Sequence, residues 1–186
     1  HPDAGAVTWG SGASGVAGAI TPLNSLVGDS LTAHVGEPSA ADYGVTALAN
    51  GNYVVRSPDW GPAGGTADVG AVTWGDGSNG SSGPVTAANS LVGATINDFI
   101  GLQNTLYPKH GLTILSNGTY VVSSPYWQRS WGESGFGAVT WGNGTTGITG
   151  EVSEANSLVG STASDRVGML REYDSINTID PLDGVI

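Results

Sequence analysis

The side chains that could do chemistry are few, and most fall outside any repeated pattern. The three histidines, His1, His34 and His110, show no His-Glu-x-x-His or similar spacing, so neither a zinc motif nor a general base is indicated. Sixteen acidic residues are present, but no spacing singles out a pair for acid–base catalysis. Cysteine is absent, which excludes thiolate chemistry, disulfides and cysteine-based metal sites. We therefore expect surface histidines and predict that the protein is not an enzyme.

Oxygen ligands in glycine-rich loops leave calcium as the one cofactor to consider, because hard cations take carboxylate oxygens on flexible turns. Asp98 and Asp165 hold equivalent places, each three residues before a glycine, where the first repeat has Ala33. No Asp-x-Asp-x-Asp-Gly loop occurs, so solvated turn carboxylates are the simpler interpretation. No metal site is predicted, and the weak calcium candidates are Asp76, Asp98 and Asp165, with Asp68 and Asn79 in similar loops.

Tryptophan is the most conspicuous residue type, with six copies. Trp60 and Trp127 each follow a Ser-Pro at the end of an expected strand, where proline stops ladder pairing, and Trp131 lies in a non-repeated loop. These rings could stack on a sugar or close a hairpin structurally. The candidate ligand-binding residues are Trp60, Trp127 and Trp131, with the adjacent Asp59 and Tyr126. The other three, Trp9, Trp74 and Trp141, recur beside a valine and are predicted to pack between repeats.

Charge and composition exclude several partners. The 186 residues carry a net charge of -11 with only five Lys and Arg, which opposes binding to nucleic acid. No run of about 18 apolar residues is present, so membrane insertion is not expected. The chain begins without an initiator methionine, and we expect it to be a processed piece of a longer protein.

The sequence repeats itself three times. The block GAVTWG begins at Gly5, Gly70 and Gly137, at spacings of 65 and 67 residues, and NSLVG keeps the same step. A second block, LANGNYVVRSPDW, returns as LSNGTYVVSSPYW 67 residues later. A fixed period of this kind indicates a repeat architecture. We expect one domain over 1–186, with units of about 5–69, 70–136 and an incomplete 137–186.

Each unit is predicted to contribute four short strands and almost no helix. Asn50-Gly51 and Asn117-Gly118 lie between apolar runs and predict a hairpin with a type I′ turn. GAVTWG alternates with a period of two and leads through a Gly-rich loop to SLVG, which predicts a second hairpin. The fold class is therefore all-β with propeller-like blades, or alternatively another stacked β-repeat or solenoid. Because DGVI at 183–186 matches only the first half of a hairpin, an open strand edge is expected there.

The two blocks together resemble the tandem repeats of very large secreted bacterial surface proteins of the filamentous-haemagglutinin-like or adhesin-like kind. The resemblance extends from Gly5 to about Gly168 and implies an extracellular or cell-surface location. It favours a non-catalytic structural or adhesive module whose partners are neighbouring repeats or other copies, and possible glycans. Two alternatives stay open: a carbohydrate-binding lectin whose ring closes by oligomerisation, and a self-assembling extracellular fibre subunit.

Overall fold

The computed structural model describes residues 3–31, 33–37, 44–102, 111–133 and 135–169. This part of the chain is all-β, as predicted, and contains no helix, so none in it is long and apolar enough to cross a membrane. The strands are β1 (Ala6–Thr8), β2 (Ser25–Val27), β3 (Val45–Ala47), β4 (Tyr53–Ser57), β5 (Ala71–Gly75), β6 (Gly83–Pro84), β7 (Ser90–Val92), β8 (Leu112–Ile114), β9 (Tyr120–Ser124), β10 (Ala138–Gly142), β11 (Gly150–Glu151) and β12 (Leu158–Val159). The half-hairpin expected at 183–186, together with His1 and His110, lies outside the described residues.

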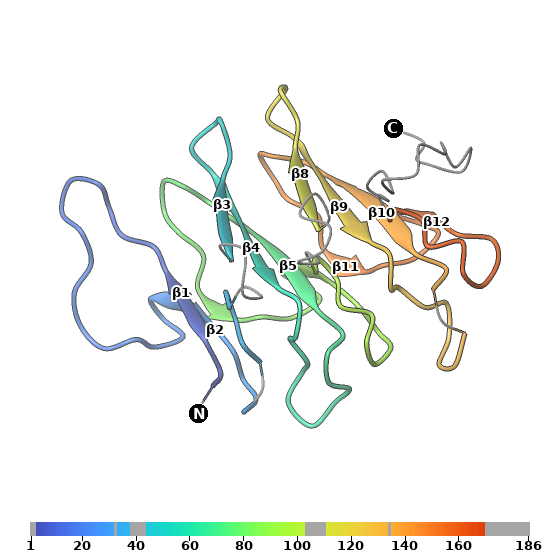
Figure 1. Cartoon of the computed structure of the whole chain (residues 1–186). Coiled ribbons are helices and arrows are strands. Elements are labelled where there is room, and N and C mark those ends of the chain that lie inside the picture. The colour runs from blue at the N-terminus through green and yellow to red at the C-terminus, as the bar shows by residue number, and fades with distance from the viewer. Residues whose placement is uncertain (1–2, 32, 38–43, 103–110, 134, 170–186) are drawn as a thin grey trace, which may run out of the picture.

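The strands form three sheets that follow one another along the chain (Figure 1). We call them the first sheet (β1-β2-β6), the middle sheet (β3-β4-β5-β7-β11, in the order β11-β7-β5-β4-β3) and the last sheet (β12-β10-β9-β8). Within the described residues they make an open row, and neither a closed barrel nor a propeller ring is present.

Both predicted hairpins are present, but their pairing crosses the sequence period. The hairpin β3–β4 pairs through β4 with β5, the Trp-Gly strand of the following period. The strand β5 then pairs antiparallel with β7, which carries Ser-Leu-Val. A sheet is therefore assembled from the end of one period and the start of the next.

The turns of the β3–β4 and β8–β9 hairpins differ from the expected type I′ turn. Leu48 N–H donates to the carbonyl of Asn52 at 2.8 Å, so the loop holds three residues instead of two. Gly51 has a positive φ of 89° whereas Asn50 does not, and a type I′ turn requires positive φ at both central residues. The second copy behaves alike, with Gly118 at φ 84°. Only the glycine of each Asn-Gly pair adopts the left-handed conformation. The Asn-Gly dipeptide occurs in both kinds of turn, so the sequence did not distinguish a three-residue loop from a two-residue type I′ turn.

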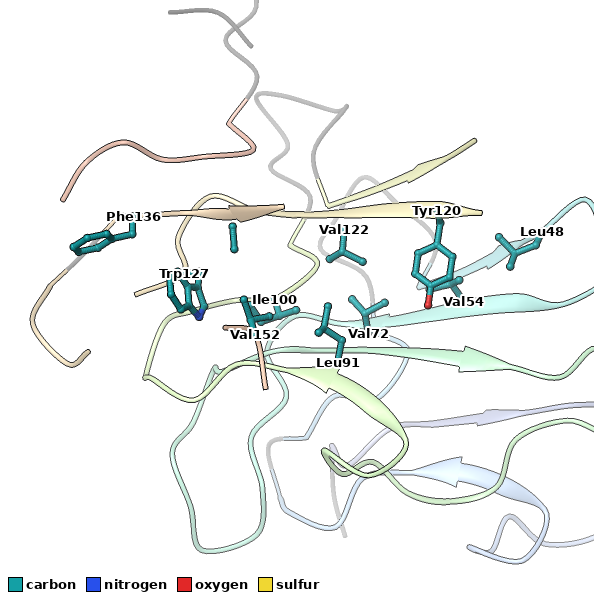
Figure 2. Packing of buried hydrophobic residues seen from close by; sticks show 11 residues of the cluster. Leu48, Val54, Val72, Leu91, Ile100, Tyr120, Val122, Trp127, Phe136 and Val152 are labelled. Atoms are coloured by element: carbon teal, nitrogen blue, oxygen red, sulfur yellow. The ribbon is translucent and has the colours of Figure 1, made fainter. Parts of the chain in front are cut away.

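The core consists of two layers of side chains, one on each face of the middle sheet. In β4, Val54 belongs to the layer against the last sheet and Val55 to the layer against the first sheet, as the period of two requires. Figure 2 shows the larger layer, which lies between the middle and last sheets. Its buried members are Leu48, Val54, Val72, Leu91, Ile100, Tyr120, Val122, Trp127, Phe136, Ala138 and Val152. Only the middle sheet is covered on both faces by described strands.

In the second and third copies of GAVTWG, the glycine of the Trp-Gly pair makes room for a tyrosine on the adjacent strand. Gly75 pairs with Tyr53 across β5 and β4, and Gly142 pairs with Tyr120 across β10 and β9. A Cβ at Gly75 would lie 2.1 Å from the ring of Tyr53, far inside van der Waals contact. Any larger residue would displace the ring, which explains the glycine in these two copies.

Candidate functional site

The predicted ligand-binding tryptophans lie in different environments. Trp60 is buried in the layer between the first and middle sheets, and Trp127 in the layer between the middle and last sheets. Their ring faces pack against aliphatic side chains and are not available for stacking on a sugar. Asp59 and Tyr126 are half-buried beside them, and Tyr126 meets Phe99 edge-on at 6.3 Å between ring centroids. Only Trp131, 82% exposed, presents a free ring, and sugar binding by it stays a prediction.

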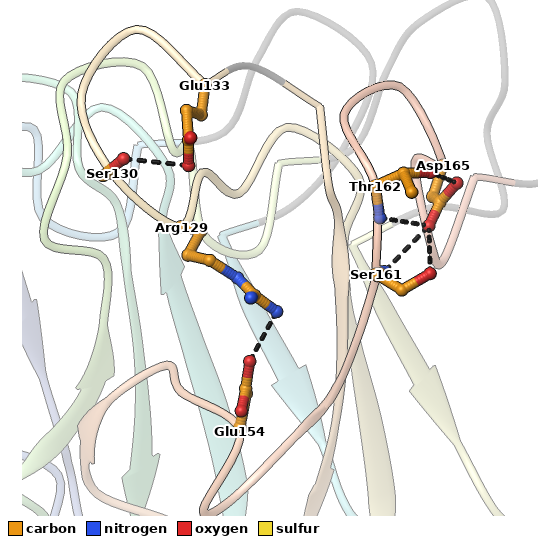
Figure 3. Close-up of polar contacts among 7 residues, drawn as sticks. All are labelled: Arg129, Ser130, Glu133, Glu154, Ser161, Thr162 and Asp165. Carbon is orange, nitrogen blue, oxygen red and sulfur yellow. Dashed lines mark hydrogen bonds and ion pairs between the residues drawn. The ribbon is translucent and has the colours of Figure 1, made fainter.

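The loop that carries Trp131 is held by charged neighbours (Figure 3). Arg129 lies 5.2 Å from the centre of the Phe136 ring, a cation–π contact, and forms an ion pair with Glu154 in the loop before β12. Ser130 donates to Glu133 at 2.9 Å within the same loop. These contacts fix both flanks of the exposed indole without covering it.

The three calcium candidates are occupied by their own turns. Asp76 accepts hydrogen bonds from Ser78 N–H at 2.7 Å and from the Asn79 amide at 2.9 Å. Asp165 accepts from Ser161 and Thr162 N–H, both at 2.8 Å (Figure 3). In the part of the chain that the structure describes, no three acidic or histidine side chains converge as they would around a metal ion.

Asp98 is the most unusual of these carboxylates because it is completely buried. One oxygen accepts from Ala94 and Thr95 N–H, and the other accepts at 2.9 Å from the N–H of Gln128, in the segment between β9 and β10. Burial raises the pKa of Asp98 to about 6 despite these bonds. Its counterpart Asp165 is exposed, and hydrogen bonds from Thr162 lower its pKa. Asp98 therefore ties two sheets together and does not present a ligand to solvent.

His34 is paired with a carboxylate. Its Nδ1 lies 2.6 Å from a carboxylate oxygen of Glu37, an exposed pair three residues apart. Asp59 interacts electrostatically with this pair and with Asp68. Its pKa is raised, mainly because the carboxyl group is partly buried and secondly because Asp68 repels its charge. Among the described residues, His34 forms no hydrogen bond with a serine or threonine hydroxyl. The contact between a base and a nucleophile that covalent catalysis uses is therefore not seen around His34 in this part of the chain.

The feature that recurs most faithfully is a joint between sheets. In each joint, a short segment from the next period adds to the edge of the preceding sheet as a parallel strand. Strand β6 pairs with β2, aligning Gly83 with Leu26, and β11 pairs with β7, aligning Gly150 with Leu91. Val85 N–H donates to Val27 O at 3.1 Å and Val152 N–H donates to Val92 O at 3.0 Å. We call these segments, Gly83–Val85 and Gly150–Val152, the exchanged strands.

A hydrogen-bond relay holds each exchanged strand in shape. In the middle period, the Asn89 amide donates to Pro84 O at 2.9 Å while its carbonyl accepts from Thr86 N–H and from the Ser90 hydroxyl. Ser90 in turn shares a 2.7 Å hydrogen bond with Thr73. The same bonds recur in the last period, around Asn156, Ser157 and Thr140. This relay explains why Asn-Ser and the threonine of GAVTWG are repeated together.

Two of the repeated tryptophans also form hydrogen bonds across the joints, although they are not fully buried. Trp9 Nε1–H donates to Gly77 O at 3.0 Å, and Trp74 Nε1–H donates to Gly144 O at 3.0 Å, each in the following period. Trp74 packs against the layer between the middle and last sheets, in line with the predicted packing between repeats. Trp141, by contrast, is 52% exposed.

The sequence did not predict the exchanged strands, although it carried a signal for them. A glycine stands six residues before the asparagine of each NSLVG block, and Val or Ile follows two residues after that glycine. Gly83 and Gly150 have φ values of 96° and 98°, so the glycine starts the segment in a conformation that other residues rarely adopt. Segments of two residues are too short to show a strand period.

This fold and these joints define an all-β tandem-repeat protein in which each following period contributes an edge strand to the preceding sheet. The chain belongs to the family described as Repeat of unknown function (DUF5650), which it matches over residues 1–37, 47–102 and 114–169. Three matched stretches confirm the three predicted repeats, whereas an adhesin-like origin stays a prediction. No curated protein and no solved structure matches the chain.

Proposed function

We propose that the chain is a non-catalytic structural module of an extracellular or cell-surface protein, built to join repeats into a continuous β stack. The observation that carries this proposal is the joint, which occurs twice with the same strand pairing and the same indole hydrogen bond. The residues that the sequence repeats most strictly are those that make the joint. A protein under selection for catalysis would instead keep a cluster of polar side chains around a cleft.

Of the two architectures expected from the sequence, we favour the open stack over propeller-like blades. The three sheets of the described residues lie in an open row and share edge pairing only with their neighbours. Repeats that contact only their neighbours give an elongated scaffold, which suits a surface protein that must hold an adhesive segment away from a cell. The extracellular location itself is inferred from the resemblance to secreted bacterial surface repeats.

Single-molecule pulling on the two ends of the chain tests the structural role. Parallel strands that cross from one period to the next must be sheared together, so we expect defined unfolding steps of reproducible length and force. The variant Asn89→Ala removes the relay of the middle period and should lower the force of the corresponding step, while Thr66→Ala, in an exposed loop away from the joints, should not. Extension without a resisting step would overturn the proposal.

A lectin is the second candidate, and the exposed indole of Trp131 is the observation that favours it. Aromatic rings displayed on a fixed loop provide a stacking surface for a sugar ring. A glycan array probed with the wild-type chain, Trp131→Ala and Trp141→Ala separates the cases, because both tryptophans are exposed but only Trp131 is predicted to contact a sugar. Binding lost only in Trp131→Ala would support the lectin, and no binding by the wild type would eliminate it.

A further inference from the structure

The two ends of the row expose the complementary halves of a joint. At one end lies the segment Gly18–Ile20, which we call the free exchanged strand because it corresponds in sequence to Gly83–Val85 and Gly150–Val152. At the other end lies β12, the counterpart of the strands β2 and β7 that accept an exchanged strand. Each of these two elements lacks a strand partner among the described residues on that side.

Burial shows what the free exchanged strand is missing. Ile20 is 63% exposed, whereas its counterparts Val85 and Val152 are buried in the layers between sheets. Beside Ile20 the first sheet has a hollow of about 350 Å³, lined by Ala4, Gly5, Ala6, Ile20, Thr21, Pro22, Val27 and Gly28. The corresponding region of the middle sheet is filled by Leu26, Ala33 and Val35 of the first sheet. Four residues that line the hollow have counterparts that are buried in the formed joint, namely Val69, Ala71, Val85 and Val92.

The free exchanged strand already has its bound conformation. The Asn24 amide donates to Ala19 O at 2.9 Å, its carbonyl accepts from Thr21 N–H at 2.8 Å, and Gly18 has a φ of 113°. These are the contacts that hold Gly83–Val85 and Gly150–Val152 within the formed joints. Little conformational entropy remains to be lost on docking, which favours association.

The accepting end is equally incomplete. Leu158 is 65% exposed, although its counterparts Leu26 and Leu91 are fully buried. Trp141 has no hydrogen-bond acceptor among the described residues, whereas Trp9 and Trp74 each reach a carbonyl of the next period. Leu158 and Trp141 thus form an apolar edge with an unused indole donor.

Glycine packing points to the same pairing. A Cβ on Gly80 or Gly147 would lie 2.6 Å from the Cβ of Trp9 or Trp74, so each glycine lies beneath a tryptophan. Their counterpart in the first period is Gly15, whose Cβ would meet nothing within 4 Å. Gly15 therefore has no tryptophan packed against it, and no glycine of the described residues is packed against Trp141 in the way that Gly80 and Gly147 pack against Trp9 and Trp74.

We propose that a second copy of this chain docks head to tail, with its Gly18–Ile20 adding as a parallel strand to β12. By analogy with the internal joints, Gly18 aligns with Leu158 and Ala19 with Val159. Ile20 N–H then donates to Val159 O, and Leu158 fills the hollow of the first sheet. The Trp141 indole donates to the carbonyl of Gly12 of the second copy. This inference rests on the proposed structural function, because it extends the same joint from one chain to the next.

The geometry of this contact leads to open-ended growth. The two surfaces are different, so each docked copy presents a new accepting edge, and such heterologous contacts form filaments unless the rotation closes a ring. The first sheet has no counterpart of the β3–β4 hairpin among the described residues, so the contact is smaller than an internal joint. We expect a dissociation constant of roughly 10–100 µM. Because each copy carries a net charge of -11, association should strengthen with added salt.

Sedimentation over a range of concentrations tests the proposal. The wild-type chain of 18.6 kDa should form species at successive multiples of that mass up to about 1 mM. Ile20→Lys places a charge in the contact and should weaken association by at least roughly a hundredfold. Leu23→Lys is the matched control, because Leu23 is exposed and its counterparts Ala88 and Ala155 stay exposed in the formed joints. A wild type that stays monomeric, or equal loss in both variants, would overturn the proposal.

Crosslinking checks the register. The chain has no cysteine, so a mixture of Ala19→Cys and Val159→Cys chains should yield a disulfide-linked heterodimer on mild oxidation, since aligned parallel residues lie within disulfide range. Pairing Ala19→Cys with Ala63→Cys, in an exposed loop, should yield none. As an internal reference, Val92→Cys with Glu151→Cys in one chain should close the corresponding joint. Equal yields for both mixtures would contradict the proposed register.

The two proposals can fail separately. A monomeric chain that still unfolds under force in defined steps would eliminate the docking between copies and leave the structural role standing. A chain that extends without resistance would eliminate the structural role. In that case the crosslinking of Ala19→Cys to Val159→Cys would show whether association between copies still uses the proposed contact.

Discussion

The segments Gly18–Ile20 and Gly150–Val152 have nearly the same local structure but different surroundings. In both, an asparagine six residues after the glycine holds the segment through the same backbone hydrogen bonds. Val152 is buried between sheets, whereas Ile20 is exposed beside an open hollow. The local bonds therefore set the conformation, and the neighbouring sheet decides the burial.

The carboxylates Asp98 and Asp165 show the same contrast in electrostatics. Both accept hydrogen bonds from the backbone of their own turn. Asp98 is also bonded to Gln128, in the segment between β9 and β10, and its burial raises its pKa to about 6, while the pKa of the exposed Asp165 is lowered. One turn thus yields opposite pKa shifts because only one copy is covered by the next sheet.

The largest difference between a formed joint and the free exchanged strand is expected in the stability lost when a charged residue is introduced. Val85→Asp places an unpaired carboxylate between sheets and should lower the free energy of unfolding by at least about 3 kcal/mol. Ile20→Asp, at the equivalent exposed place, should change it by less than about 0.5 kcal/mol. Urea denaturation at a concentration where the chain is monomeric measures both, and equal losses would contradict the difference in burial between Val85 and Ile20.

The next effect is a pH dependence specific to Asp98. Its folded-state pKa of about 6 lies above the ordinary value of 3.8, so its contribution to stability is full below about pH 4 and is lost as the pH rises through about 6. Relative to Asp98→Asn, the wild type should lose up to about 3 kcal/mol between about pH 4 and pH 7.5.

The control for this pH dependence is Asp165→Asn. Hydrogen bonding lowers the pKa of Asp165, so that carboxylate stabilises the fold above its unfolded pKa, and its contribution is lost only as the pH falls. Its variant should keep the wild-type slope between about pH 5 and pH 7.5. If Asp165→Asn flattened the profile as much as Asp98→Asn, burial would not be the cause.

A smaller effect is expected at the glycines beneath the tryptophans. Gly147→Ala and Gly15→Ala share the strain of a positive φ, at 74° and 68°. Only Gly147→Ala adds a methyl group against the Trp74 side chain, so it should cost about 2 kcal/mol more in thermal or urea unfolding. Equal costs would mean that Trp74 moves aside freely.

The smallest effect is expected from the indole hydrogen bond. Trp74→Phe removes the donor to Gly144 O and should cost about 1 kcal/mol beyond the lost ring area. Trp141→Phe should leave the stability of the monomer unchanged within error, yet weaken docking between copies. A stability loss in Trp141→Phe as large as in Trp74→Phe would show that this indole is already bonded within one chain.

Ligand binding at the predicted site stays a prediction, and the sequence did not indicate how far each of its residues would be buried. Trp131 is exposed, and Asp59 and Tyr126 are half-buried. Trp60 and Trp127 follow the same Ser-Pro pattern but point into the core. A strand end can face either way, because the direction depends on the sheet that packs against it, which the period does not encode.

By itself, the sequence determined the all-β class, the three periods, both hairpins and the alternation that places Val54 and Val55 on opposite faces, because these follow from local backbone preferences and a period of two. The tertiary structure decided which period each hairpin joins, the transfer of Gly83–Val85 and Gly150–Val152 to the preceding sheet, and the burial of Asp98. These depend on contacts between residues that are distant in the sequence, such as Leu26 with Gly83, aligned across β2 and β6, and Asp98 with Gln128, 30 positions apart. Three copies with nearly the same local sequence therefore differ only in what covers them.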